Sequence, residues 1–295
     1  TVSIVRTHLP LPVRHSQIVV RKSPHYLPPN RATTITTPST TTTMQITIDF
    51  WQTLYDTANG TERNEGRRSA LFTAIAAENE APDQERFDEV YRSVWGFFDE
   101  EWLGKQRTPS SEEMIAFMMR ELDTSIGDDA LASVVHVFEE NIIAHPPHLM
   151  PHAAEALALL AEQGPLAIIS DTAFSPGRVL RQVMERDGIA DHFSAFSFSN
   201  ETGVAKPNPK AFLYALEEID GAPETALHIG DIERTDVKGA RNVGMTAILY
   251  RNDEHRHAYV EEETEAERVL EAWNRAVEIC LDNNANETDR ASDGK

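Results

Sequence analysis

The chain is poor in cysteine and in long apolar segments, and each shortage excludes a class of protein. One cysteine, Cys280, stands among 295 residues, which excludes an internal disulfide framework and a metal cluster built on cysteines. No stretch approaches the roughly 20 apolar residues that cross a bilayer, so we expect no membrane span and no membrane partner. Because a lone cysteine is compatible with a reducing compartment, we expect a cytoplasmic location.

Basic residues are also scarce. Lys and Arg number 27 against 48 for Asp and Glu, a formal net charge of −21. All 48 acids lie within 44–295 together with 22 of the basic residues, so that part carries a net charge of −26. A field of this sign repels polyanions, and nucleic-acid binding is therefore disfavoured. A lysine-poor, acidic composition is also typical of proteins adapted to high salt, where screening relieves self-repulsion.

The two ends of the chain have a different composition from the middle. Residues 1–43 are rich in Thr, Pro and Arg, contain no acid and show no apolar period, which predicts a disordered segment. The segment resembles an organelle transit peptide, or it is an upstream extension before a true start at Met44. The position of Met44 directly before an apolar strand favours the second interpretation. The polar tail 282–295 is predicted to be disordered as well.

Between these ends, short apolar strands alternate with helical patterns. The expected strands are 45–49, 166–170, 193–198, 226–230 and 245–250. The expected helices between the first two strands are 62–79, 84–104, 110–122 and 128–144. After the last strand, 262–281 reads as one long acidic helix.

This alternation predicts the α/β fold class, with a doubly wound, Rossmann-like parallel sheet covered by helices on both faces. The expected core comprises 44–55 and 149–281. The helical block 56–148 is expected to form an inserted subdomain.

Polar side chains stand where the expected strands end. Asp49 ends the first strand and Ser170 the second, while Lys206 lies in a loop before Pro207. Asp231 ends the fourth strand, and Asp236 follows five residues later. Since ligands bind beyond the carboxyl ends of parallel strands, these groups are expected to converge.

Such a group of side chains suits an anionic substrate and a divalent cation. Asp49 is a candidate nucleophile, since a carboxylate can form a covalent acyl-phosphate or ester intermediate. Asp49 and Asp231 offer the oxygen ligands that Mg²⁺ prefers. Lys206 would neutralise the charge shared by nucleophile and substrate, and Ser170 would bind non-bridging oxygens together with backbone N–H groups after Asp49.

These segments resemble, in order, the four motifs of the haloacid dehalogenase-like (HAD) hydrolase superfamily. They are the segment Asp49-Phe-Trp-Gln-Thr53, the strand ending at Ser170, the Lys206-Pro pair, and Gly-Asp231 with Asp236 after it. The resemblance covers about 44–280, and the insertion at 56–148 is similar to the helical cap of that family. It implies a hydrolase in which Thr53, Ser170 and Lys206 bind substrate. It also implies that the carbonyl of Trp51 binds the metal with Asp49, Asp231 and Asp236.

One position departs from the family pattern. Phosphatases of the family carry a second Asp two residues after the nucleophile, where it protonates the leaving group and then activates water. Trp51 occupies that position here and can do neither. An aromatic residue there resembles the dehalogenase branch, whereas Gly-Asp231 resembles the phosphatases.

Three functions follow from this mixture. The first is a Mg²⁺-dependent phosphatase acting on a small phosphorylated metabolite through an aspartyl-phosphate on Asp49. The second is a 2-haloacid dehalogenase-like hydrolase, and the third is a catalytically weak protein that binds phosphate and metal. A homodimer is compatible with each of them.

The insertion contains residues that admit a structural or a functional interpretation. Trp95, Phe98 and Trp102 fall within one expected helix and are interpreted as subdomain core. Arg67 and Arg68 near the start of the insertion could meet an anionic substrate, although a solvated helix face is the simpler interpretation.

Overall fold

The structure is a computed structural model that describes residues 43–251, 259, 261 and 263–282. The predictions of disorder for 1–43 and 282–295 concern residues that lie outside this part, apart from Thr43 and Asp282.

Within the described ranges, six parallel strands form one sheet in the order β3-β2-β1-β4-β5-β6. Their bounds are β1 Gln45–Ile48, β2 Leu166–Ser170, β3 Phe193–Phe198, β4 Ala226–Gly230, β5 Thr246–Tyr250 and β6 Arg268–Leu270. The chain builds outward from β1 to β3, then crosses to β4 and continues in the other direction. The order therefore reverses between β1 and β4, which is where doubly wound sheets bind ligands.

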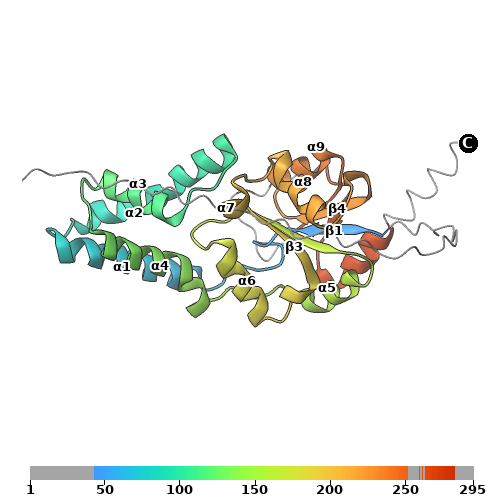
Figure 1. Cartoon of the computed structure of the whole chain (residues 1–295), viewed down its shortest axis with the longest axis horizontal. Helices are drawn as coiled ribbons and strands as arrows, with labels where there is room; N and C mark the ends of the chain where they lie inside the picture. Colours follow the sequence, from blue (N-terminus) through green and yellow to red (C-terminus); the bar gives the residue numbers. More distant parts are fainter. Residues whose placement is uncertain (1–42, 252–258, 260, 262, 283–295) are drawn as a thin grey trace, which may run out of the picture. The chain divides into compact units, whose positions relative to one another are not determined.

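Helices cover both faces of this sheet (Figure 1). On one face, α5 (Ala153–Ala161) and α6 (Gly177–Arg186) pack on Ile46 and Ile168, and on the other α8 (Pro209–Glu218) and α9 (Lys238–Val243) pack on Ile169. The remaining short elements are η2 Ala190–His192, α7 Ser199–Thr202, η3 Pro223–Thr225, η4 Glu233–Val237 and η6 Trp273–Arg275. Strands buried on both faces explain their continuous apolar sequences, and the predicted Rossmann-like class is confirmed.

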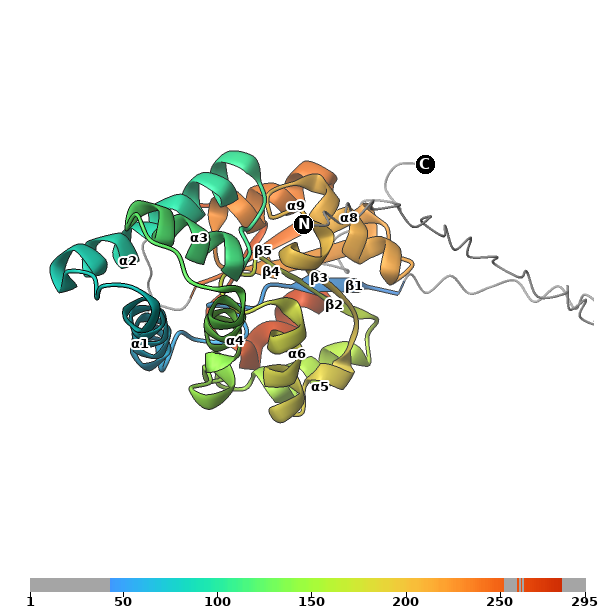
Figure 2. The ribbon, with the colours of Figure 1, turned by 60° about the vertical axis from the view of Figure 1, so that its left-hand side comes forward.

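The segment between β1 and β2 contains four α-helices between residues 60 and 144 (Figure 2). They are α1 Gly60–Glu78, α2 Gln84–Asp99, α3 Ser111–Glu121 and α4 Asp128–Ala144, and α2 continues into a π-helical turn, η1, Glu100–Gly104. Each lies close to its predicted range. These helices share a hydrophobic cluster that includes Leu71, Val94, Met114 and Phe138 and that Phe174 and Ala205 join from the loops after β2 and β3. None of the helices in the described ranges is both long and apolar enough to span a bilayer.

The predicted long helix at 262–281 is wrong. Residues Arg268–Leu270 form β6, which pairs with β5 through Tyr250 and Leu270, and helical backbone begins only at Trp273. Trp273 is fully buried and donates its Nε1–H to Thr53 O at 2.8 Å. The glutamates that suggested a helix were overridden by strand pairing and by the burial of this indole, because helix propensity is a weak determinant beside tertiary packing.

Candidate active site

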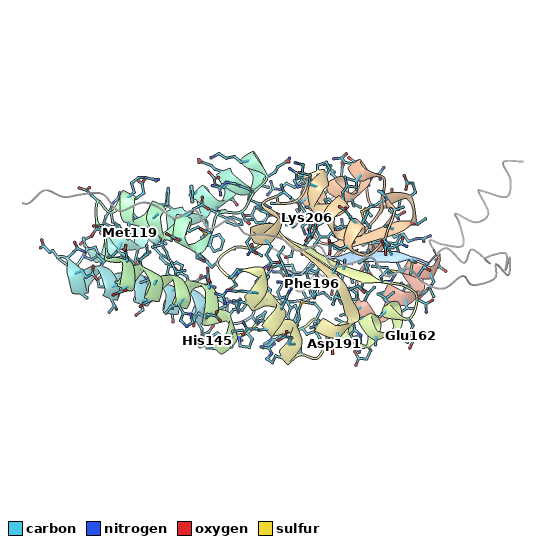
Figure 3. The ribbon with its side chains drawn as sticks, in the orientation of Figure 1. Met119, His145, Glu162, Asp191, Phe196 and Lys206 are labelled. Atoms are coloured by element: carbon cyan, nitrogen blue, oxygen red, sulfur yellow. The ribbon has the colours of Figure 1, made fainter. Side chains whose placement is uncertain are left out.

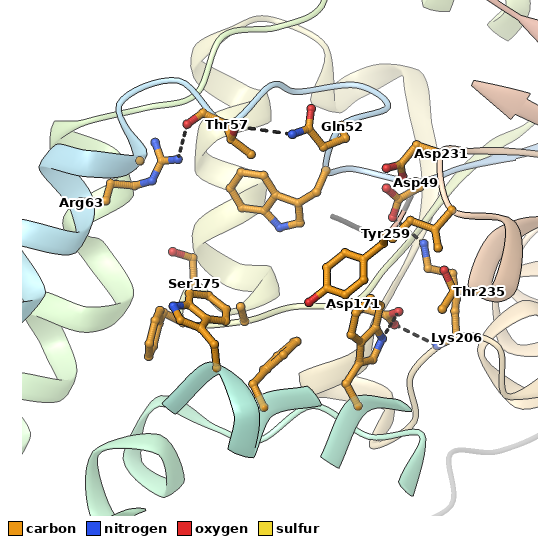
Figure 4. A pocket seen from close by; sticks show the side chains of 18 of the residues that line it. Asp49, Gln52, Thr57, Arg63, Asp171, Ser175, Lys206, Asp231, Thr235 and Tyr259 are labelled. Atoms are coloured by element: carbon orange, nitrogen blue, oxygen red, sulfur yellow. Dashed lines mark hydrogen bonds and ion pairs between the residues drawn. The ribbon is translucent and has the colours of Figure 1, made fainter. Parts of the chain in front are cut away.

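The charged residues of the site gather at the carboxyl ends of β1 and β4. Ile48 pairs with Ile229 in the ladder between these strands, so Asp49 and Asp231, which come after them, are neighbours. The backbone N–H of Asp49 extends the ladder to Ile229 O at 2.9 Å. Figure 4 shows both carboxylates on one side of a pocket, with Lys206 nearby. The convergence predicted from the strand ends is present.

Lys206 joins two of the carboxylates. Its Nζ lies 2.5 Å from Asp49 Oδ1 and 2.6 Å from Asp236 Oδ1, and the residue is 2% exposed. Burial lowers the pKa of Lys206, but the charges of Asp236, Asp49 and Asp171 more than offset it, so its pKa lies above the usual value. The charged ammonium is therefore the favoured form of this side chain. Figure 3 shows Lys206 toward the four-helix insertion, away from Glu162, which precedes β2.

Negative charge exceeds positive charge around this ammonium. Burial raises the pKa of Asp49; Lys206 opposes the shift, while Asp236 and Asp231 add to it. The pKa of Asp49 lies well above its ordinary value as a result. A further cation at this point would relieve the repulsion and restore the ionised carboxylate.

Asp236 is held by donors on both of its oxygens. Besides Lys206, its Oδ1 contacts His228 Nε2 at 3.0 Å, while Oδ2 accepts from the N–H of Ile232 and from the Thr235 hydroxyl. Burial raises the pKa of Asp236, but Lys206 and His228 lower it by a larger amount, so this pKa lies below the usual value. These contacts give Asp236 the geometry of a support for Lys206, and its predicted role as a metal ligand stays a prediction.

Two features of β4 hold Asp236 in place. His228 is buried against Phe212, with ring centroids 5.1 Å apart, and its Nδ1 lies 2.8 Å from Thr47 Oγ1 on β1. A Cβ on Gly230 would lie 2.4 Å from Asp236 Cγ, so only glycine permits this approach. His228 is therefore packed in the core and also anchors the carboxylate that holds Lys206.

Asp171, after β2, links Lys206 to the insertion. Its Oδ1 accepts from the backbone N–H of Lys206 at 2.9 Å, and its Oδ2 accepts from Trp102 Nε1 at 2.8 Å. Burial raises the pKa of Asp171 to about 6, against the opposing effect of Lys206. Asp171 is therefore a bridge between Lys206 and η1.

The predicted substrate-binding residues Thr53 and Ser170 lie beside the pocket rather than on its wall. Thr53 is buried and donates to Asp231 Oδ1 at 3.3 Å, which fixes that carboxylate. Ser170 is 1% exposed, and within the described ranges its Oγ has no hydrogen-bond partner. A buried hydroxyl without a hydrogen-bond partner costs free energy. The predicted contact of Ser170 with substrate oxygens would supply such a partner, and it remains a proposal.

The tight turn after Asp49 shapes the backbone of the first motif. Gln52 has a φ of 56°, and its N–H donates to Tyr55 O, while the N–H groups of Leu54 and Tyr55 both donate to Phe50 O. A left-handed non-glycine residue is costly and is concentrated at functional sites. The turn leaves Trp51 half-buried, where it lines the pocket beside Asp49.

The pocket itself has a volume of about 370 Å³ and joins the charged strand ends to the insertion. Its other walls carry the aromatic residues Trp51, Trp95, Phe98, Trp102, Phe174 and Tyr259. Phe98 and Trp102 are also part of the hydrophobic cluster of the insertion, as predicted, but Trp95 is 40% exposed. Arg63 and Arg67 line the pocket as well, whereas Arg68 turns away and pairs with Asp88.

A sequence profile of the haloacid dehalogenase-like hydrolases matches residues 43–244. The chain belongs to this family. It is 26% identical over 213 residues to the glyceraldehyde 3-phosphate phosphatase of Methanopyrus kandleri, covering 71% of this chain and 84% of the relative. It is 38% identical over 110 residues to the pyrimidine 5'-nucleotidase YjjG of Escherichia coli. That match spans 36% of this chain and less than half, 46%, of the relative.

The fold is also that of the HAD superfamily. The HAD hydrolase YfnB of Bacillus subtilis, in a crystal structure with bound magnesium, superposes with a TM-score of 0.55 at 17% identity. The match covers 80% of this chain and 98% of YfnB. Together with the family profile, this confirms the resemblance based on the four motifs.

The residues at the strand ends include candidate ligands for a metal ion. Among the described residues, no three side chains of His, Cys, Asp or Glu converge as a metal cluster. Asp49 and Asp231 supply two carboxylates, and the carbonyl of Trp51 could supply a third oxygen. An oxygen-only set completed by water is what Mg²⁺ requires. A divalent cation would also balance the excess negative charge around Lys206. The residues present therefore fit Mg²⁺.

Proposed function

We propose that the chain is a Mg²⁺-dependent phosphatase of a small phosphorylated metabolite, with Asp49 as the nucleophile. The observation that carries this proposal is the buried contact of Lys206 with Asp49 and Asp236, beside Asp231. The phosphoryl group and the Asp49 carboxylate are both negatively charged and repel each other. The Lys206 ammonium, held between carboxylates at this end of the pocket, can offset that repulsion. The match to the Methanopyrus kandleri phosphatase, which covers most of both chains, supports it.

The reaction has two steps at phosphorus. An oxygen of Asp49 bonds to phosphorus while the bond to the leaving oxygen breaks, and that oxygen takes up a proton from solvent. Water then attacks phosphorus and releases a proton to solvent, the bond between phosphorus and Asp49 breaks, and phosphate and the Asp49 carboxylate are formed. Lys206 faces Asp49 throughout and neutralises charge on the transferring group. Mg²⁺, when bound by Asp49, Asp231 and the Trp51 carbonyl, would supply further charge neutralisation.

No described side chain takes the place of the acid that Trp51 replaces. Asp171 lines the pocket, but both of its oxygens accept hydrogen bonds, from Lys206 N–H and from Trp102 Nε1–H. The leaving oxygen therefore has no evident proton donor from the protein. We infer that the enzyme turns over esters with good leaving groups and acyl phosphates fastest, because these need little protonation.

The insertion is proposed to act as a cap over the pocket, since α1, α2 and η1 supply part of its wall. A cytoplasmic location and a homodimer stay predictions.

The proposal is tested by assaying the full chain on phosphate esters and acyl phosphates, at low and high KCl, with Mg²⁺ and with EDTA. Turnover should require both Mg²⁺ and Asp49, so Asp49→Asn is the control. Failure of the folded protein to turn over any phosphorylated substrate would sink the proposal.

The aromatic Trp51 favours one alternative, displacement of halide from a 2-haloacid by Asp49. Turnover in ¹⁸O-water separates the two reactions, because hydrolysis of an alkyl ester labels the Asp49 carboxylate. Attack at phosphorus labels the released phosphate instead.

A further inference from the structure

Arg67, on α1, is a buried cation on the wall of the pocket that contains Asp49. The residue is 6% exposed. Its Nε donates to Phe138 O at 2.8 Å, its Nη2 donates to Ser175 Oγ at 3.3 Å, and the guanidinium carbon lies 4.7 Å from the Phe174 ring centroid. In the described part of the chain, Nη1 has no hydrogen-bond partner. The side chain is thus held rigidly with one corner of its fork unused.

No acid neutralises this arginine among the described residues. Arg67 is absent from every ion pair there, although its neighbour Arg68 pairs with Asp88 and Arg178 pairs with two glutamates. Burial lowers the pKa of Arg67 to about 10, and the titratable groups that act on this pKa are Tyr91 and Arg63, neither of them a carboxylate. In a chain with 48 acids, a buried guanidinium without one is costly unless a ligand supplies the charge.

Arg63 adds to the positive charge at this end of the pocket. It lies one helical turn before Arg67 on the same helix, and like charges at this spacing repel. Its guanidinium donates to the carbonyls of Ala58 and His145 and so is committed to holding the backbone. In Arg67 only Nε and Nη2 have partners among the described residues, so its Nη1 remains available to a ligand.

The space between Arg67 and the catalytic end is bounded by aromatic rings. Figure 4 shows Ser175, the partner of Arg67, on the far side of the pocket from Asp49, Asp231 and Lys206. The six aromatic residues of the wall can pack against a flat apolar body. A cavity of about 370 Å³ has room for one small molecule with an anion at each end.

We propose that Arg67 binds a carboxylate carried by the substrate's leaving group, so that the substrate is the phosphate ester of a small aromatic carboxylic acid. A guanidinium fork is complementary to a carboxylate, and the two form charge-assisted hydrogen bonds. The phosphate end of this assignment rests on the proposed function, whereas the carboxylate end does not. The experiments separate the two.

The first experiment measures binding without turnover. Benzoate and benzamide are titrated into the full chain with Mg²⁺ and inorganic phosphate, and the fluorescence of the pocket tryptophans is followed. Benzoate should bind about tenfold more tightly than benzamide, and Arg67→Met should abolish the difference. Arg68→Met is the matched control, because it removes the same charge from the next residue outside the pocket and should retain the preference.

A benzoate affinity equal to that of benzamide, or one that survives Arg67→Met in a folded protein, would overturn the proposal. Arg67→Lys keeps the charge but not the fork and provides a second test if the methionine variant does not fold. It should keep only part of the preference, and full retention would also count against a bidentate contact.

The second experiment compares the hydrolysis of 4-carboxyphenyl phosphate with that of 4-carbamoylphenyl phosphate. The wild type should prefer the carboxylate ester about tenfold in kcat/KM, and Arg67→Met should lose this preference while still hydrolysing the amide. Equal rates that depend on Asp49 would refute the carboxylate site and leave the phosphatase intact. Benzoate binding through Arg67 with no turnover of either ester would refute the phosphatase proposal and leave the carboxylate site intact.

Discussion

The two ends of the pocket differ in how their charges are satisfied. At the strand ends, the charge of Lys206 is shared by two carboxylates and fixed through Asp171, His228 and Thr235. At the insertion, Arg67 contacts the Phe174 ring, the Phe138 carbonyl and the Ser175 hydroxyl but no acid among the described residues. A cation that is already paired and fixed suits chemistry repeated on every substrate, whereas a cation without an acid suits recognition of one kind of substrate.

This contrast predicts that changes at the strand ends lower kcat for all substrates, whereas changes on the aromatic wall alter KM for particular ones.

The largest effect is expected from Asp231→Asn, which removes a carboxylate of the proposed metal site. Turnover should fall at least about a hundredfold for every phosphate ester, because several kcal/mol of charge stabilisation are lost. EDTA should reproduce the loss in the wild type, with recovery on adding Mg²⁺. Steady-state kinetics across Mg²⁺ concentrations would check this, and a variant with unchanged Mg²⁺ dependence would remove Asp231 from the site.

Gly230→Ala tests whether packing at the end of β4 holds Asp236. The new Cβ would lie 2.4 Å from Asp236 Cγ, so the free energy of unfolding should fall by about 2 kcal/mol and turnover should fall with it.

The matched control is Gly96→Ala in α2, where a Cβ meets nothing within 4 Å. It should stabilise the chain by about 0.5 to 1 kcal/mol, since alanine is the better helix former. Equal effects of the two substitutions in urea unfolding would contradict the packing argument.

Asp171→Asn should change how stability depends on pH. Burial raises the pKa of Asp171 from 3.8 to about 6, so the folded chain binds this proton more tightly than the unfolded chain. Asp171 therefore lowers the free energy of unfolding as pH rises between about 4 and 6.

As pH rises across that window, the free energy of unfolding of the variant should increase by about 2 kcal/mol relative to that of the wild type. Asparagine cannot accept from both Lys206 and Trp102, but that cost does not vary with pH. Urea unfolding with EDTA at several pH values measures the difference, and a flat difference would exclude a raised pKa.

The smallest effect is expected from Trp102→Phe, which keeps a ring on the wall but removes the donor to Asp171. The loss of one hydrogen bond should cost about 1 kcal/mol of stability and raise KM more than it lowers kcat. Trp95→Phe changes the same wall without touching Asp171 and should leave stability within about 0.5 kcal/mol. Indistinguishable variants would argue against the bridge through Asp171.

The sheet could be predicted from the sequence because buried parallel strands read as short apolar runs. Asp49 and Asp231 directly follow strands, where topology alone brings polar groups together, and Lys206 and Asp236 lie in the segments that follow β3 and β4. The predicted helix at 262–281 failed because β6 depends on pairing with Tyr250 and on the burial of Trp273, which no local pattern reveals.

The aromatic wall and the bridge to the insertion were also beyond the sequence. The contact between Trp102 and Asp171 joins residues 69 positions apart, and nothing in either segment predicts it. For Arg67 and Arg68 alike, a solvated helix face was the simpler interpretation of the sequence, and contact with an anionic substrate was the alternative. The burial of Arg67 against Phe174 and Ser175 depends on how α1 meets the loop after β2.

The central claim is that Asp49 carries the phosphoryl group during turnover. The most direct measurement is mass mapping of the full chain after rapid acid quench of a reaction with acetyl phosphate and Mg²⁺. We expect one phosphoryl group on the peptide that contains Asp49, absent from Asp49→Asn and from the EDTA sample. A phosphoryl group on another residue, or turnover that continues in Asp49→Asn, would contradict the account.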